Sequence, residues 1–299
     1  MKASAFDFIR AESISHVLEL LHDHQDDELK LIAGGQSLVP MMAMRLARPS
    51  ILVDINRLTE LKHIDIQKSL VSIGAGVRQR DIEFNTNILI KLPLVKKALY
   101  WVGHEQTRNR GTIGGSLCFA DPSAELPLSA LILNAQMHIA NAQDGTRCIS
   151  ADEFFLGPMF TAVGLTDCLQ QIDWPIWAGE HIGCEFLEMS IRKGDFALAS
   201  AAGQIELDSS GLVKRASFGL GGVGGTPLVF PSLANQLIGQ RISESVAIEI
   251  SHQAALLTEP GSDMHASADY RRSVARTLLK RVLLQAHENA LGLTSQFKH

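Results

Sequence analysis

Two short glycine-rich segments constrain this chain more than any other feature of its sequence. Residues 32–38 read Ile-Ala-Gly-Gly-Gln-Ser-Leu after an apolar run, and residues 111–116 read Gly-Thr-Ile-Gly-Gly-Ser. Adjacent glycines at the end of a strand leave backbone N–H groups open to an anion, especially where a helix begins just beyond. Each segment alone is equally typical of a tight turn that uses the positive φ of glycine. Two of them nearly 80 residues apart indicate loops that hold a pyrophosphate from both sides.

The composition is that of an ordinary globular protein. Of 299 residues, 46% are hydrophobic and 20% charged, which is enough for a sizeable core and too apolar for disorder. The net charge of −5 argues against a nucleic-acid partner, because such proteins usually carry a basic face. The N-terminus lacks an apolar signal region, and no apolar run approaches the roughly 20 residues that span a bilayer. We therefore expect a cytoplasmic protein without a transmembrane segment.

The cysteines and histidines give no sign of a metal site or a catalytic constellation. Cys118, Cys148, Cys168 and Cys184 form no C-x-x-C pair, and the eleven histidines show no H-x-H or H-E-x-x-H spacing. This argues against zinc or iron–sulfur ligation within the chain. We expect free thiols in a reducing compartment, no metal ligand and no catalytic residue.

Hydrophobic periodicity predicts a mixed chain of about two domains. Ser13 or Ser15 is expected to cap the first helix. The expected strands are 4–10, 29–33, 51–55, 70–75, 136–142, 196–207 and 213–220, and the expected helices include 39–46, 124–133, 243–257 and 268–290. The last helix carries a basic group, Arg271, Arg272, Arg276, Lys280 and Arg281, typical of a solvated face or a subunit contact. Because strands and helices are segregated, the predicted class is α+β, with a domain boundary near residue 176.

Three polar or glycine-rich features remain open to two interpretations each. Asp121 and Glu125 follow the second glycine segment; an acid there would contact a sugar hydroxyl or a ring N–H, or else Asp121 or Ser123 would cap a helix. His104 lies either near a cofactor or in a structural hydrogen bond. Residues 219–224 fit G-x-G-x-x-G, but Gly225-Thr-Pro follows where the dinucleotide fingerprint needs a helix. We expect a glycine-rich loop after a strand there.

The motifs together resemble a known family. Ala-Gly-Gly-Gln-Ser-Leu-Val-Pro at 33–40, Thr-Ile-Gly-Gly-Ser at 112–116, Ala-Asp-Pro-Ser-Ala-Glu-Leu-Pro at 120–127, Arg-Lys-Gly-Asp-Phe-Ala at 192–197 and His-Ala-Ser-Ala-Asp-Tyr-Arg-Arg at 265–272 are similar to the FAD-binding medium subunit of molybdenum hydroxylases of the carbon monoxide dehydrogenase and xanthine dehydrogenase type. The resemblance extends from Phe6 to about residue 285.

The resemblance implies the fold and the domains. An FAD-binding domain of the vanillyl-alcohol-oxidase (PCMH) type would occupy residues 1–176, in two subdomains of about 1–55 and 56–176. A smaller α+β domain with a three-stranded sheet, of the carbon monoxide dehydrogenase flavoprotein type, would occupy residues 177–299. Leu187 stands where some relatives have a lysine, so no charge is expected at that point.

The cofactor site is carried over from the resemblance, position by position. The FAD-binding residues expected from it are Ile32, Ala33, Gly34, Gly35, Gln36, Ser37, Leu38, Val39, Val102, His104, Thr107, Thr112, Ile113, Gly114, Gly115, Ser116, Asp121, Glu125 and Leu169.

The resemblance also implies a division of labour. A large subunit would hold a molybdenum–pterin cofactor, a small subunit two 2Fe–2S clusters, and this chain FAD, in a dimer of heterotrimers that passes electrons to an external acceptor. The alternative is a self-contained flavin-dependent oxidase or dehydrogenase. Because the substrate pocket would lie on another subunit, an N-heteroaromatic compound, carbon monoxide, an aldehyde and a purine all fit the sequence.

Overall fold

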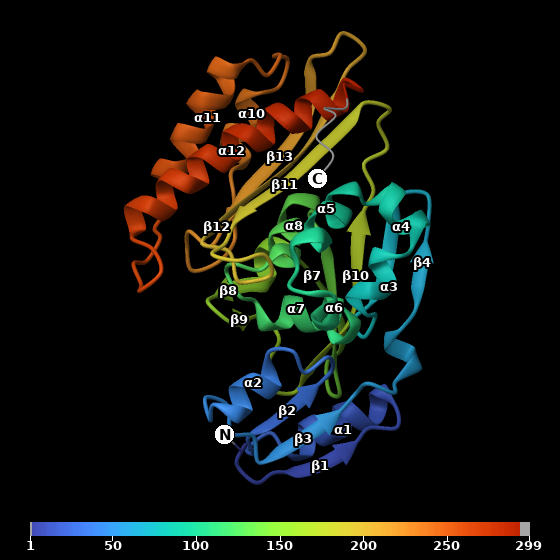
Figure 1. The fold of residues 1–299 in the computed structure, drawn as a ribbon. Coiled ribbons are helices and arrows are strands. Elements are labelled where there is room, and N and C mark those ends of the chain that lie inside the picture. Colours follow the sequence, from blue (N-terminus) through green and yellow to red (C-terminus); the bar gives the residue numbers. More distant parts are fainter. Residues whose placement is uncertain (1, 294–299) are drawn as a thin grey trace. The chain divides into compact units, whose positions relative to one another are not determined.

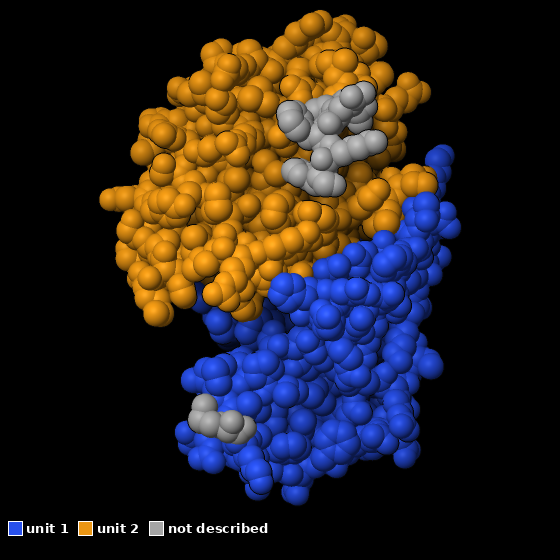
Figure 2. Space-filling model, in the orientation of Figure 1, with its two compact units in different colours: residues 1–88, 104–120, 135–174 blue, residues 89–103, 121–134, 175–299 orange. Residues whose placement is uncertain are grey.

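The computed structural model describes residues 2–293 (Figure 1), and the chain divides into two compact units (Figure 2). Unit 1 consists of Met1–Ile88, His104–Ala120 and Ala135–Trp174, and unit 2 of Leu89–Gly103, Asp121–Asn134 and Pro175–His299. Two segments from the first half of the sequence therefore belong to unit 2. The predicted boundary near residue 176 is a single cut in the sequence, whereas the segments of the two units alternate along the chain. The boundary stays a prediction.

The first sheet of unit 1 is parallel, with the strand order β1-β3-β2. It contains β1 (Asp7–Arg10), β2 (Leu29–Ile32) and β3 (Ile51–Asp54), with α1 (Ile14–Asp23) between β1 and β2 and α2 (Leu38–Ala43) after β2. Val17 and Leu21 of α1 are buried in the same apolar cluster as Val53. The Ser13 hydroxyl accepts a hydrogen bond from the His16 N–H at 3.0 Å, so Ser13, and not Ser15, is the cap.

The second sheet of unit 1 has five strands in the order β4-β5-β10-β6-β7. These are β4 (Ile64–Ile66), β5 (Leu70–Gly74), β6 (Gln136–Asn141), β7 (Gly145–Ser150) and β10 (Asp167–Pro175). The remaining elements of this unit are the 3-10 helix η1 (Thr59–Leu61), α3 (Gln79–Glu83), α6 (Glu105–Arg110), α7 (Ile113–Phe119), α9 (Ala151–Phe154) and the pair β8 (Phe155–Gly157) and β9 (Phe160–Thr161).

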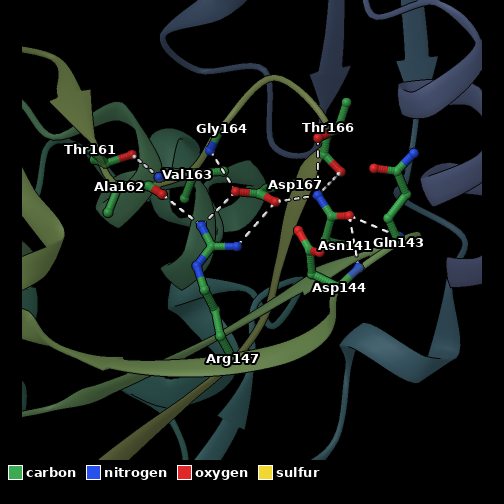
Figure 3. A network of polar contacts seen from close by, with 10 residues as sticks. All are labelled: Asn141, Gln143, Asp144, Arg147, Thr161, Ala162, Val163, Gly164, Thr166 and Asp167. Atoms are coloured by element: carbon green, nitrogen blue, oxygen red, sulfur yellow. Dashed lines mark hydrogen bonds and ion pairs between the residues drawn. The ribbon is translucent and has the colours of Figure 1, made fainter.

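A buried carboxylate joins the β6–β7 hairpin to the start of β10 (Figure 3). Asp167 accepts hydrogen bonds from Arg147 at 2.6 and 3.2 Å, from the Asn141 amide at 2.8 Å and from the Gly164 N–H at 2.7 Å. Burial raises the pKa of Asp167, but these hydrogen bonds outweigh it and hold the pKa below its ordinary value. The network fixes the loop before β10 by charge-assisted contacts.

Unit 2 is built on an antiparallel sheet in the order β11-β12-β13-β14. Its strands are β11 (Ile182–Met189), β12 (Ala199–Leu207), β13 (Val213–Gly221) and β14 (Leu228–Val229), and its helices are α5 (Pro93–Trp101), α8 (Glu125–Leu133), α10 (Pro231–Gln236), α11 (Glu244–Leu256) and α12 (Ala268–Ala290); α4 (Thr86–Lys91) begins in unit 1 and ends here. Every residue of β12 is buried. Helix α12 packs on β11 and β12, and helices α5 and α8 also contact the sheet.

The expected three-stranded sheet is corrected to four strands. After β13 the chain turns back at Gly222, whose φ is +72°, and β14 pairs with β13 through Gly219–Val229 and Leu220–Leu228. The expected loop at 219–224 is therefore only partly right, because Gly219 and Gly221 lie inside β13.

The basic group on α12 is also corrected. Arg271 is 9% exposed, and its guanidinium donates to the Leu198 carbonyl at 2.8 Å and to Asp263 at 2.7 Å. Arg272 and Lys280 form surface ion pairs with Asp269 and Glu244. The expected solvated face thus contains one buried arginine that ties α12 to the start of β12.

Candidate functional site

The first glycine segment forms a tight bend between β2 and α2. Gly35 has a φ of +72°, which glycine adopts without strain. Gly34 packs against the main chain at the start of the second segment, since a Cβ built there would lie 2.4 Å from the Arg110 carbonyl oxygen and 2.8 Å from the Gly111 Cα. Within residues 2–293, no acceptor receives the main-chain N–H groups of Gly35, Gln36 or Ser37. Three successive free amides before a helix suit an anionic ligand.

The second glycine segment is not the loop that its sequence predicts. Residues 113–116 form the first turn of α7, and the Thr112 hydroxyl caps that helix by accepting the Gly115 N–H at 3.0 Å. The N–H groups of Ile113 and Gly114 donate to the carbonyls of Val77 and Ala75 at 3.0 and 2.9 Å, and that of Ser116 to the Thr112 carbonyl. Because these N–H groups already donate hydrogen bonds within the protein, this segment has no row of free donors for a ligand. It offers only a surface that a ligand could approach closely.

The two glycines of that segment differ in what surrounds them. A Cβ on Gly114 would lie 2.4 Å from the Ala75 Cβ, so packing within the protein explains this glycine. Gly115 is exposed, and a Cβ there would meet only the hydroxyl of its own cap, Thr112. A side chain at this surface position would disturb that cap, and glycine also leaves the surface open to the close approach of a ligand.

A polar cluster that sequence reasoning missed fastens the two glycine segments together. The Arg78 guanidinium donates to the Arg110 carbonyl and to the Asn56 side chain, and Asn56 donates to the carbonyl of Ile32. Burial and the charge of Arg110 lower the pKa of Arg78. No motif marks these residues, because the contacts join positions distant in sequence.

The other site residues expected in unit 1 lie close to this framework or in the core. His104 is exposed at the N-terminus of α6 and forms no side-chain cap. Thr107 of α6 accepts the Gly111 N–H through its carbonyl at 2.6 Å. Leu169 is a buried residue of β10, 5% exposed. In unit 2, Val102 is buried at the end of α5.

The two acidic positions belong to unit 2. Asp121 accepts the Ser123 N–H at 2.8 Å, and the N-cap of α8 is Ala124, so neither Asp121 nor Ser123 caps the helix. Burial raises the pKa of Asp121, and the hydrogen bond from Ser123 offsets part of that effect. Glu125 is half-buried in the first turn of α8.

Sequence reasoning also missed a buried acid of unit 2, which lies near Glu125. Glu188 of β11 is 7% exposed, and neither of its carboxyl oxygens has a hydrogen-bond partner. Burial, with the nearby Glu125 charge as the second cause, raises the pKa of Glu188 to about 8. The signal available in the sequence was the spacing of Glu188, Phe186 and Cys184, which are two residues apart and so share the buried face of the strand.

Two further observations concern metals and membranes. In the described part of the chain, no group of three or more histidine, cysteine, aspartate or glutamate residues is arranged to hold a metal ion. None of the helices in residues 2–293 has the length and apolar character needed to cross a membrane.

Two family models match the chain. The model for the FAD-binding domain in molybdopterin dehydrogenase matches residues 4–177, and the model for the carbon monoxide dehydrogenase flavoprotein C-terminal domain matches residues 185–286. Together they extend over most of the sequence.

Named relatives match over nearly their full length. The chain is 36% identical to the 6-hydroxypseudooxynicotine dehydrogenase complex subunit alpha of Paenarthrobacter nicotinovorans, over 100% of both chains. It is 36% identical to a chain of quinoline 2-oxidoreductase from Pseudomonas putida 86, with a TM-score of 0.91 over 97% of this chain and 100% of that chain. A carbon monoxide dehydrogenase of Hydrogenophaga pseudoflava, which lacks the Mo-pyranopterin moiety of its molybdenum cofactor, has a chain 31% identical to this one, with a TM-score of 0.92 over 96% of this chain and 98% of that chain.

Proposed function

This chain belongs to the FAD-binding subunits of molybdopterin-dependent dehydrogenases and hydroxylases, and on that premise we propose that it is the electron-transfer subunit of a heterotrimeric molybdenum hydroxylase. It is an oxidoreductase subunit with an FAD-binding domain. The observation that most directly supports cofactor binding is the set of three free amides at Gly35–Ser37, together with the exposed surface at Gly115.

The residues present fit FAD. In unit 1, the free N–H groups of residues 35–37 suit a pyrophosphate, and the bare surface at Gly115 admits a ligand that a Cβ would displace. The full proposed contact set is that expected from the sequence: 32–39, Val102, His104, Thr107, 112–116, Asp121, Glu125 and Leu169.

The chain's own residues bind and orient the cofactor. The N–H groups of Gly35, Gln36 and Ser37 would hold the anionic pyrophosphate, and Thr112 keeps α7 capped so that Gly115 presents an unobstructed surface. An acid such as Glu125 accepts a hydrogen bond from a ring N–H or a sugar hydroxyl. When bound, FAD would supply the redox chemistry that links the iron–sulfur clusters of a partner subunit to an external acceptor.

The partners follow from the same proposal. A large subunit with the molybdenum–pterin cofactor would carry out the hydroxylation, and a small subunit with two 2Fe–2S clusters would relay electrons, in a dimer of heterotrimers in the cytoplasm. The first relative is itself named as one subunit of a complex. The competing proposal, a self-contained flavin oxidase, needs substrate turnover by this chain alone.

Purification separates the two proposals. The chain should copurify from its native source with a large molybdenum-containing and a small iron–sulfur-containing subunit, and acid precipitation should release its flavin into the supernatant. The isolated chain should show flavin absorbance and no turnover of candidate substrates. Substrate turnover by the isolated chain would favour the oxidase, and a chain that binds no flavin would refute both.

A further inference from the structure

Arg78 stands at a position where local structure gives no reason for an arginine. It is the N-cap residue of α3, yet its side chain makes no capping hydrogen bond. The residues that stabilise a helix from that position are Ser, Thr, Asp and Asn, whose short side chains accept a main-chain N–H. The N–H of Gln79, the first residue of α3, donates instead to the Gly111 carbonyl at 2.9 Å. The reason for the guanidinium therefore lies outside α3.

Main-chain and side-chain contacts hold Arg78 beside both glycine segments. It forms an isolated antiparallel bridge with Thr112 of the second segment. Its guanidinium donates to the Arg110 carbonyl oxygen, the same oxygen that lies 2.4 Å from a Cβ built on Gly34. The guanidinium is therefore next to the first segment as well, directly before the free N–H groups of residues 35–37.

Asn56 orients the guanidinium and leaves most of its donors free. The Asn56 side-chain N–H groups donate to Asp54 at 2.6 Å and to the Ile32 carbonyl at 3.3 Å, so its oxygen accepts from Arg78 at 2.6 Å. A guanidinium has five N–H donors, and the acceptors on Asn56 and at residue 110 use two of them. Within the described part of the chain, the other three N–H groups have no acceptor.

Arg78 is also a half-buried cation without a carboxylate partner. No carboxylate of residues 2–293 lies within ion-pair distance of it, and Asp54 is paired with Arg10 at 3.6 Å. Burial and then the charge of Arg110 lower the pKa of Arg78, while Asp81 and Asp54 offset part of that effect; the guanidinium stays protonated nonetheless. Because cations withdrawn from water are normally paired, an unpaired one with free donors, near a second cation, indicates a negatively charged ligand.

We propose that Arg78 donates hydrogen bonds to the pyrophosphate of bound FAD and is the cation of that site. This inference rests on the proposed function, because it takes FAD as the ligand. The planar guanidinium offers parallel, charge-assisted donors to phosphate oxygens, and the free N–H groups of residues 35–37 supply neutral donors on the adjoining main chain. The competing explanation is that Arg78 only links the two glycine segments and touches no ligand.

The first test is the affinity of the full-length chain for FAD, measured by flavin fluorescence at low and at high salt. Arg78→Gln should bind FAD about tenfold more weakly at low salt, the loss expected for a charge-assisted hydrogen bond. Wild-type affinity should fall with added salt because salt screens the attraction, and Arg78→Gln should show a smaller fall. Lys68→Gln removes one positive charge at an exposed position between β4 and β5 of the same unit, and it should match the wild type.

Two further variants separate the charge from the link between the segments. Arg78→Lys keeps the charge and loses the planar fork, so it should keep the wild-type salt dependence and bind FAD more tightly than Arg78→Gln. Asn56→Ala removes a contact of the link and leaves the cation in place, so its salt dependence should also remain that of the wild type. If Arg78 were only a link, Arg78→Gln would share that unchanged salt dependence.

Inorganic pyrophosphate gives a readout that involves no flavin contact. It should compete with FAD for the wild-type chain, and its inhibition constant should be about tenfold larger for Arg78→Gln. If Arg78→Gln does not fold, the same comparison is made with Arg78→Lys, for which the inhibition constant should be several-fold larger than for the wild type.

Two results would overturn the proposal in distinguishable ways. A wild-type chain that binds no FAD overturns the proposed function and this assignment with it. A wild-type chain that binds FAD, beside an Arg78→Gln variant with unchanged salt dependence and an unchanged inhibition constant for pyrophosphate, overturns the assignment of Arg78 alone, even if the variant binds FAD more weakly.

Discussion

At the scale of single residues, four glycines that look alike in the sequence have different physical reasons. Gly35 supplies a positive φ, and Gly34 and Gly114 allow backbone to approach backbone or a neighbouring side chain. Only Gly115 is exposed, with nothing but its cap nearby. Substitutions should therefore separate effects on folding from effects on cofactor binding.

Gly115→Val should strongly reduce FAD occupancy, because its β-substituents project onto the surface proposed for the ligand. The loss of the helix cap should cost only about 1 kcal/mol of folding stability. Flavin content per chain, measured from absorbance after gel filtration, checks this. Thr112→Ala removes the same cap without adding bulk; if it lost as much FAD as Gly115→Val, the helix end and not the glycine surface would be responsible.

Gly114→Ala should instead impair folding. Its Cβ would lie 2.4 Å from the Ala75 Cβ and 2.7 Å from the Ala75 carbonyl oxygen, so α7 would have to move away from the residues that hold it. We expect a loss of about 2 kcal/mol or more in the free energy of unfolding, measured by urea denaturation. Unchanged stability would show that this contact is not tight.

Asp167→Asn should destabilise the chain by about 2 kcal/mol at pH 7, because it leaves Arg147 without its carboxylate partner. Hydrogen bonds hold the pKa of Asp167 below its ordinary value despite burial, so its contribution is present at neutral pH. That contribution disappears as the pH falls below about 4, through the lowered pKa. Stability curves of the two proteins should converge in acid, whereas Asp26→Asn, at an exposed position of unit 1 outside this network, should follow the wild type throughout.

At the scale of elements, the contact of α12 with β11 determines the packing of unit 2. A Cβ on Gly183 would lie 2.0 Å from the Ala286 carbonyl oxygen, so the strand and the helix touch through main-chain atoms. Residues of α12 such as Leu279, Val282 and Leu283 fill the apolar cluster on this side of the sheet. Such a contact has no room for a single methyl group.

Gly183→Ala should therefore lower the free energy of unfolding by about 3 kcal/mol or more. The control is Gly261→Ala, since a Cβ at Gly261 meets nothing within 4 Å and its φ is not positive. Thermal unfolding followed by circular dichroism measures both variants. Similar melting temperatures for the two would contradict the close approach.

Element prediction from the sequence succeeded where local signals were strong. The buried helix at 124–133 and the long helix at 268–290 agree with α8 and α12 to within a residue. The short strands β4 and β14 were missed because three or two residues carry too little periodicity. The longer strands β7 and β10 were not predicted either. The first turn of α7 was taken for a loop because two glycines weaken the helical signal, although tertiary hydrogen bonds to Ala75 and Val77 hold that turn in place.

At the scale of the whole molecule, FAD should stabilise the folded chain through mass action. At a free concentration about 100 times Kd, a ligand that binds only the folded state adds about 2.7 kcal/mol. For a chain of 299 residues this corresponds to an increase of about 4 °C in the melting temperature. Differential scanning fluorimetry with and without FAD checks this, and Gly115→Val should show little increase; an equal increase in both proteins would argue against the role of Gly115.

The sequence by itself determined the family and the cofactor class. The glycine pairs, their flanking hydroxyls and the acidic segment at 121–125 are local patterns, and local patterns are readable because backbone requirements restrict which residues can serve at each position. Only the tertiary structure decided which glycine amides stay free, why Gly114 and Gly115 differ, and that the Arg78 guanidinium lies beside both glycine segments. Those properties arise from strand register and from packing between segments distant in sequence, and a pattern along the chain does not record which distant atoms come within hydrogen-bonding distance.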